Sequence, residues 1–152
     1  MRSPGAWWST RIPGPACRAS QAPNGWDAIP GARGCTPQSC AFRDHYAELK
    51  ALGVAAVYGL STQDTAYQRE VAERLHLPFA LLSDERLALT AAMKLPTFQV
   101  GTMVLLKRLT LIIRDGTVEH VFYPVFPPDR NAGDVVRWLA DASANSRDTA
   151  AE

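Results

Sequence analysis

The sequence predicts an α/β fold with a mixed central sheet flanked by helices. Residues 36–93 alternate between segments of helical period and short apolar runs, as expected where helices connect the strands of one sheet. A hairpin signal at residues 109–123 adds an antiparallel pair, and a final helical segment follows it. Parallel and antiparallel pairings together make the predicted sheet a mixed one.

The first half of this region predicts two helices around a buried strand. A helix is expected at residues 36–52, where apolar side chains recur at i, i+4 and i+7 and Gly53 supplies a stop: Phe42, Tyr46 and Leu49. Residues 54–60 are almost continuously apolar, which is typical of a central strand covered on both faces. Residues 64–76 carry one apolar stripe and end before a proline, which predicts a second helix.

The second half predicts a short strand, a hairpin and two further helices. Residues 79–82 fit a buried strand, after which Asp84 is expected to cap a third helix. Residues 97–106 are expected to be extended. Asp115-Gly116 separates two apolar segments and suits the positive φ of a tight hairpin turn. A proline-rich loop then precedes a last helix that opens at one of two polar residues, Asp129 or Asn131.

The chain changes character near residue 27. Residues 1–26 hold three arginines, no acidic residue and many Pro, Gly, Ser and Ala residues, which predicts an irregular, flexible arm. We find no β-like run in this arm that would fill the middle of the sheet. Residues 27–142 are assigned to the folded domain, and residues 143–152 to a polar tail.

Composition narrows the classes of function. The 152 residues suit one domain, and 16 basic against 15 acidic side chains leave no net field that would attract nucleic acid or an anionic membrane. No apolar run approaches the roughly 18 residues of a membrane span. The chain does not open like a signal peptide, and we expect a cytoplasmic protein. An odd number of cysteines, three, argues against a secreted disulfide framework.

Two cysteines mark the candidate site. Cys35 and Cys40 lie where the Gly/Pro-rich segment turns into the first predicted helix. Thr36 suits the N-cap and Pro37 the first turn, so Cys35 is expected at the positive end of the helix, where a thiolate is favoured. Five residues along a helix amount to a rise of about 7.5 Å, more than a disulfide spans, so the first turns must unwind before these two cysteines can bond.

The order of elements and several motifs resemble the peroxiredoxins of the thioredoxin-like fold, and most of all their Q-type or bacterioferritin-comigratory group. The resemblance covers residues 27–140 and is carried by four stretches: Gly34-Cys35-Thr36-x-x-x-Cys40, Phe42-Arg43-Asp44, Gly59-Leu60-Ser61 and Leu81-Leu82-Ser83-Asp84. A fifth stretch, Arg108 in Lys107-Arg108-Leu109-Thr110 ahead of Asp115-Gly116, is similar to the segment with the family's active-site arginine.

This resemblance implies a three-layer thioredoxin-like fold and a thiol peroxidase. Cys35 would attack hydrogen peroxide or an alkyl hydroperoxide and become a sulfenic acid, Cys40 would resolve it as a disulfide, and Arg108 would assist. Thioredoxin or a similar dithiol would be the reductant. The resemblance implies no cofactor and no metal, and a monomer or weak homodimer.

The sequence departs from the family pattern just before Cys35. The family has a Thr three residues before this cysteine and a Pro seven before it, where this chain has Ala32 and Ala28. Ser9 or Thr10 are conceivable substitutes for the missing hydroxyl, although their spacing supports neither. An apolar strand should also precede the motif. Because the arm shows none, the alternative is a catalytically impaired fragment that serves as a redox-sensing or interaction domain.

Other thiol chemistries fit less well. Zinc binding through Cys35 and Cys40 would need two more ligands, and the three histidines have no suitable spacing: His45, His76 and His120. A cysteine hydrolase would need a histidine within reach of the nucleophile, and none of the three lies in a recognisable motif. The remaining interpretation is that Cys35 and Cys40 are two part-buried thiols without a function.

Overall fold

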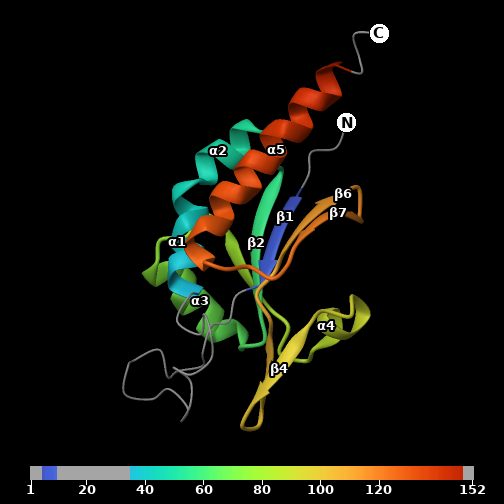
Figure 1. The fold of residues 1–152 in the computed structure, drawn as a ribbon. Helices are drawn as coiled ribbons and strands as arrows, with labels where there is room; N and C mark the ends of the chain where they lie inside the picture. Colours follow the sequence, from blue (N-terminus) through green and yellow to red (C-terminus); the bar gives the residue numbers. More distant parts are fainter. Residues whose placement is uncertain (1–4, 10–34, 149–152) are drawn as a thin grey trace.

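The computed structural model describes residues 5–9 and 35–148 (Figure 1). Within these residues the strands are β1 (Gly5–Ser9), β2 (Ala56–Ser61), β3 (Ala80–Ser83), β4 (Thr97–Val100), β5 (Met103–Leu106), β6 (Thr110–Arg114) and β7 (Thr117–Phe122). The helices are α1 (Cys35–Asp44), α2 (Tyr46–Ala51), α3 (Thr65–Arg74), α4 (Ala88–Ala92), the short 3-10 helix η3 (Pro128–Arg130) and α5 (Asn131–Asp148). None of the helices in these two ranges has the length and apolar character that crossing a bilayer requires.

A five-stranded mixed sheet forms the centre of the molecule, with strand order β3-β2-β1-β6-β7. β1 pairs in parallel with β2, and β2 in parallel with β3. β6 pairs antiparallel with both β1 and β7. The predicted mixed sheet is therefore confirmed, and β4 and β5 form a separate hairpin that extends from its lower end in Figure 1.

The N-terminal segment corrects one prediction. The sequence pattern indicated no strand in residues 1–26, yet Gly5–Ser9 forms β1 in the middle of the sheet. Its register places Trp7 opposite Tyr58 of β2 on one side and Leu111 of β6 on the other. The reason is tertiary: β2 and β6 would each leave a row of backbone N–H and C=O groups unpaired, and five residues of extended chain satisfy both rows.

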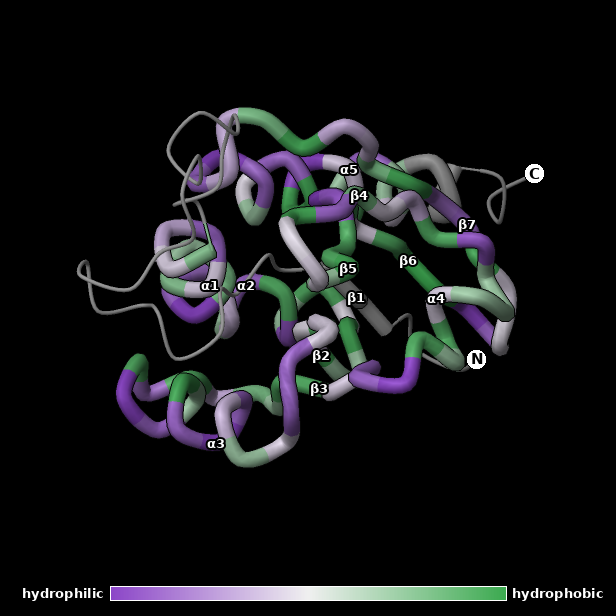
Figure 2. Tube along the Cα trace, turned by 90° about the horizontal axis from the view of Figure 1, so that it is seen from below, coloured by the Kyte–Doolittle hydropathy of each residue, from purple (hydrophilic) through white to green (hydrophobic). Residues whose placement is uncertain are grey.

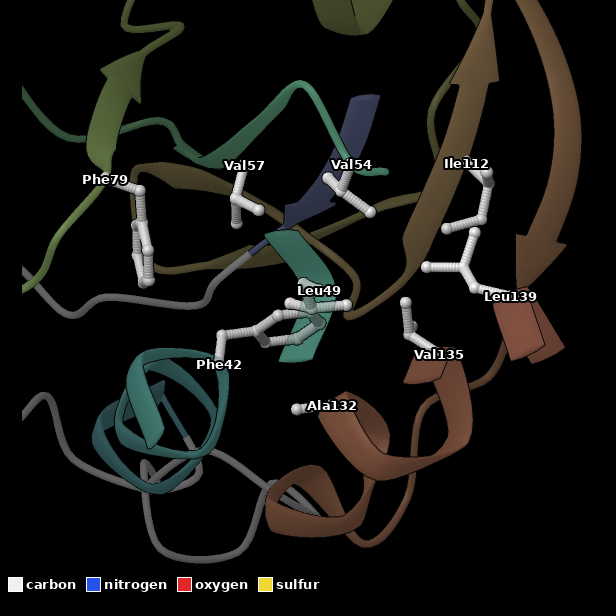
Figure 3. Packing of buried hydrophobic residues seen from close by; sticks show 9 residues of the cluster. All are labelled: Phe42, Leu49, Val54, Val57, Phe79, Ile112, Ala132, Val135 and Leu139. Atoms are coloured by element: carbon white, nitrogen blue, oxygen red, sulfur yellow. The ribbon is translucent and has the colours of Figure 1, made fainter. Parts of the chain in front are cut away.

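Helices lie on both sides of the sheet (Figure 2). The helices α1, α2, α3 and α5 lie on one side and α4 lies on the other, which gives the three layers of the predicted thioredoxin-like fold. The main core lies between the sheet and the first of these layers. Phe42 and Leu49 point into it and are fully buried, as Figure 3 shows. Its other members come from the sheet, α5 and adjoining loops: Val54, Val57, Phe79, Ile112, Ala132, Val135 and Leu139.

Most predicted elements are present with shifted ends. The helix expected at residues 36–52 is interrupted at His45 and becomes α1 and α2. The extended segment 97–106 is the β4–β5 hairpin. The helix expected from Asp129 or Asn131 begins at Asn131, after η3, and continues to Asp148, so it includes residues that the sequence assigned to the polar tail.

The β6–β7 hairpin confirms the turn prediction. Asp115 and Gly116 have φ values of 51° and 78°. Positive φ at both central residues is what the commonest tight two-residue hairpin turn requires. This turn reverses the chain, so that β7 runs back along β6. β6 itself pairs antiparallel with β1, so its start lies beside the end of β1.

Asp84 organises the loop that leads into α4. Its carboxylate accepts hydrogen bonds from the backbone N–H of Leu89 at 3.0 Å, from the N–H of Thr90 at 2.7 Å, and from the Thr90 hydroxyl at 2.5 Å. Burial alone would raise the pKa of Asp84, but these hydrogen bonds, first that of Thr90, outweigh it and hold the pKa below its ordinary value of 3.8. Asp84 thus binds the first turn of α4, as predicted, although the helix itself starts only at Ala88.

Candidate active site

Cys35 begins α1 and is 5% exposed. The helix starts one residue earlier than predicted, so Thr36 lies inside the first turn and is not the N-cap. The backbone N–H groups of this turn have no partner further back in the helix, and the helix dipole makes this end positive. Cys35 and Val71 of α3 form a small buried cluster, and the partly buried Leu81 of β3 packs against this cluster. Its thiol is therefore shielded by apolar side chains at the positive end of a helix.

Arg108 lies against this thiol. It belongs to the connection between β5 and β6, is 4% exposed, and its Nη2 donates a hydrogen bond to Cys35 Sγ at 3.4 Å. The sheet explains the meeting of two residues so far apart in sequence. Thr110 pairs with Trp8 near the end of β1, so Arg108, two residues earlier, lies just beyond that end. The structure thus brings together two of the three site residues that the sequence predicted.

Cys40 lies on the same helix but apart from this cluster. It is half-buried, and Cys35 and Cys40, which both lie in the continuous helix α1, are not joined by a disulfide. Arg43, one helical turn further on, donates from Nη1 to the carbonyl oxygen of Leu75 at 3.0 Å and from Nε to Asp44 at 2.9 Å. Asp44 and, to a smaller extent, the charge of the Cys40 thiolate raise the pKa of Arg43.

Three further buried polar residues complete the site, and the sequence did not predict them. Arg108 Nη1 donates to Gln38 Oε1, and Gln38 Nε2 donates to Asn131 Oδ1 at 3.0 Å. The same oxygen of Asn131 accepts a hydrogen bond from the Thr110 hydroxyl at 2.6 Å. The exposed fractions of Gln38, Thr110 and Asn131 are 0%, 0% and 2%.

A signal for one of these three residues was present in the sequence. Gln38 follows Cys35 by three positions, the spacing that places two side chains on one face of a helix. Asn131 was noted only as a candidate helix start, and nothing distinguished Thr110 from its neighbours. Ala32 and Ala28, which stand where the family has Thr and Pro, lie outside the described residues. So do Thr10 and the side chain of Ser9, the two candidates for the missing hydroxyl.

The arrangement suits a reactive thiol. A guanidinium at hydrogen-bond distance and the positive end of a helix both favour the thiolate, which is the nucleophilic form of cysteine. Histidine, cysteine and acidic side chains form no group of three or more suitable for a metal ion anywhere in residues 35–148. What the cluster offers chemically is a shielded sulfur nucleophile with a fixed cation beside it.

Comparison with known proteins identifies the family. A family model described as Redoxin matches residues 4–136. The chain belongs to the redoxin family. This redoxin is 36% identical over 107 residues to "Peroxiredoxin Q, chloroplastic" of Oryza sativa subsp. japonica, which covers 70% of this chain and 48% of that protein. It is 34% identical over 110 residues to "Peroxiredoxin Q, chloroplastic" of Arabidopsis thaliana, which covers 72% of this chain and 50% of that protein. The redoxin thus spans about half the length of the curated relatives it matches.

Solved structures agree on the fold. Peroxidoxin BcpB from Mycobacterium tuberculosis superposes with a TM-score of 0.71 at 22% identity, over 93% of this redoxin and 80% of that chain. The bacterioferritin comigratory protein of Xanthomonas campestris, in a structure concerned with its alkyl peroxide reduction activity, gives a TM-score of 0.70 at 16% identity, over 93% and 81%. Together with the curated relatives named peroxiredoxin Q, which are 36% and 34% identical, these findings confirm the predicted resemblance to the Q-type peroxiredoxins.

Proposed function

We propose that this redoxin is a thiol-dependent peroxidase in which Cys35 is the peroxidatic cysteine. The observation that carries the proposal is the hydrogen bond from Arg108 Nη2 to Cys35 Sγ at the start of α1. The curated relatives named peroxiredoxin Q, and the Xanthomonas campestris protein that reduces alkyl peroxides, support the same chemistry. The substrate class we propose is hydrogen peroxide or an alkyl hydroperoxide.

The first step would be attack of the Cys35 thiolate on one peroxide oxygen. A sulfur–oxygen bond forms, the O–O bond breaks, and the departing oxygen leaves with the bonding pair and takes up a proton as water or alcohol. Arg108 and the positive end of the α1 helix dipole would stabilise the negative charge on the departing oxygen. Thiolate formation alone supplies only a small part of the rate acceleration. Lowering a thiol pKa from about 8.5 to about 6 raises the thiolate fraction at pH 7 roughly 30-fold, which is equivalent to about 2 kcal/mol of the activation barrier.

The second step would be resolution by Cys40. Its thiolate attacks the sulfur of the Cys35 sulfenic acid, a disulfide forms, and the S–O bond breaks; the hydroxide that departs takes up a proton from solvent and leaves as water. Because both cysteines lie in α1 five residues apart, the first turns of this helix must unwind before the sulfur atoms can meet. Thioredoxin or a similar dithiol would then reduce the disulfide by thiol–disulfide exchange.

Peroxide-dependent oxidation of a thiol reductant tests the proposal. We expect the unmodified chain to turn over with thioredoxin, Cys35→Ser to be inactive, and Cys40→Ser to consume one equivalent of peroxide and stop when thioredoxin is the only thiol present. Cys17 is the third cysteine of the sequence and has no proposed role, so Cys17→Ser serves as the matched cysteine control and should retain full turnover. A folded chain that consumes no peroxide would refute the proposal and support the alternative, a redox-sensing or interaction domain without catalysis.

The expectations of a cytoplasmic location and of a monomer or weak homodimer stay predictions. Analytical ultracentrifugation of the reduced and of the oxidised chain would measure the oligomeric state.

A further inference from the structure

A chain of four buried polar side chains links the thiol site to the first residues of α5 and β6. It runs from Thr110 at the start of β6, through Asn131 at the start of α5 and Gln38 in α1, to Arg108. Each of the four is at most 4% exposed. Buried polar groups at this depth depend on one another for hydrogen bonds, since water has little access to them.

The hydrogen bonds of this chain have a defined direction. Asn131 Oδ1 accepts from both the Thr110 hydroxyl and Gln38 Nε2, which assigns the NH₂ group of Gln38 to the Asn131 side. The carbonyl oxygen of Gln38 then faces Arg108 and accepts from its Nη1. If the Gln38 amide turned by 180°, its NH₂ group would meet the guanidinium, and two donors would face each other.

We propose that Asn131 and Thr110 are positioning residues that hold the Gln38 amide in the one orientation in which its oxygen fixes Arg108 against Cys35. The hydrogen bonds of Asn131 and Thr110 lead to Gln38, so both residues act on the thiol through Gln38. The role of Arg108 rests on the proposed function, whereas the orientation of the guanidinium toward Cys35 is measurable without any peroxide. Loss of the acceptor at position 131, or of the hydroxyl that fixes it, lets the amide turn and the guanidinium move away from the sulfur.

The pH dependence of Cys35 alkylation by iodoacetamide tests this inference. The measurement is made on a Cys17→Ser, Cys40→Ser background, so that Cys35 is the remaining thiol. We expect Asn131→Ala and Thr110→Val each to raise the midpoint by about 0.5 to 1 pH unit, because a displaced guanidinium stabilises the thiolate less. Thr110→Ser retains the hydroxyl and should restore the midpoint to within about 0.2 unit of the background, well inside the shift expected from removal of the hydrogen bond.

A matched control separates positioning from general loss of packing. Thr90 is also a buried threonine, 7% exposed, whose hydroxyl donates to Asp84 on the other side of the fold. Thr90→Val removes a comparable buried hydrogen bond, and we expect it to lower the melting temperature without moving the alkylation midpoint. A midpoint shift in Thr90→Val as large as that in Thr110→Val would overturn the inference.

A double-mutant cycle tests whether the effect passes through Arg108. In an Arg108→Met background, Asn131→Ala should move the midpoint no further, since the group it positions is gone. An equal shift in both backgrounds, or no shift in folded Asn131→Ala and Thr110→Val, would overturn the inference. Absence of peroxidase activity with the midpoint shifts intact would refute the proposed function and leave the positioning role standing.

Discussion

Replacement of Arg108 by methionine removes the cation beside Cys35 while it keeps an unbranched side chain in a site that is 4% exposed. The magnitude follows from the 3.4 Å between Nη2 and Sγ. Two unit charges at that separation attract by about 1.2 kcal/mol at the dielectric constant of water and by about 5 kcal/mol at an effective value of 20. These energies correspond to a change of about 1 to 3.5 units in the pKa of the thiol.

We therefore expect the alkylation midpoint of Cys35 to rise in Arg108→Met by about 1 to 3 units, to near the value of about 8.5 for a free thiol. Peroxide reduction at pH 7 should fall further than alkylation does, by about an additional 100-fold, because the guanidinium would also stabilise the departing oxygen. Arg108→Lys keeps the charge but loses the planar guanidinium that contacts both Gln38 and Cys35. Its alkylation midpoint and its rate of peroxide reduction should therefore lie between those of the unmodified chain and those of Arg108→Met.

Arg114→Met is the matched control, because Arg114 is a half-exposed arginine that pairs with Glu119 at the other end of β6. Its alkylation midpoint and its peroxide reduction should equal those of the unmodified chain. An unchanged midpoint in a folded Arg108→Met variant would refute the electrostatic reasoning. Equal losses of alkylation and of peroxide reduction would refute the separate role of Arg108 in stabilising the departing oxygen.

Three predictions concern the fold. Phe42→Ala, at a side chain with 0% exposure in the main core, should lower the free energy of unfolding by about 3–5 kcal/mol in denaturant titration. Because the pKa of Asp84 is lower in the folded chain, its contribution to stability is complete above about pH 4 and is lost as the pH falls through the folded value; Asp84→Asn should show a smaller loss of stability between pH 5 and pH 2. Trp8→Pro removes a backbone donor from a strand paired on both sides and should abolish the native circular dichroism spectrum, whereas a native spectrum would contradict the central position of β1.

Local pattern was enough to predict most of the fold. The apolar period that buries Phe42 and Leu49, the continuous apolar run of β2 and the Asp115-Gly116 turn all depend on neighbours close in sequence. β1 was missed because Gly5–Ser9 has too few alternating or β-branched residues to indicate a strand. Its place depends on two partner strands, about 50 and 100 residues away, that need a neighbour.

The candidate site was predicted only in part, again because sequence pattern reports local features and not contacts between distant segments. Cys35 and Arg108 were found because a thiol at a helix start and an arginine ahead of a strand lie in recognisable stretches. Asn131 and Thr110 carry no local signal, since a polar residue at the start of a helix or strand is ordinary. Their importance appears only when the sheet places β6 beside β1 and α5 brings its first residue to Gln38.

Gln38 lies between the two cysteines in α1, and this position would couple the proposed resolution by Cys40 to the placement of Arg108. Any unwinding that lets Cys35 reach Cys40 must carry Gln38 away from both Asn131 and Arg108. Formation of the disulfide would thus disrupt the site that binds peroxide. An oxidised molecule would not react with a second peroxide until a reductant breaks the disulfide and the helix re-forms. One amide side chain would in this way make the two halves of the cycle mutually exclusive.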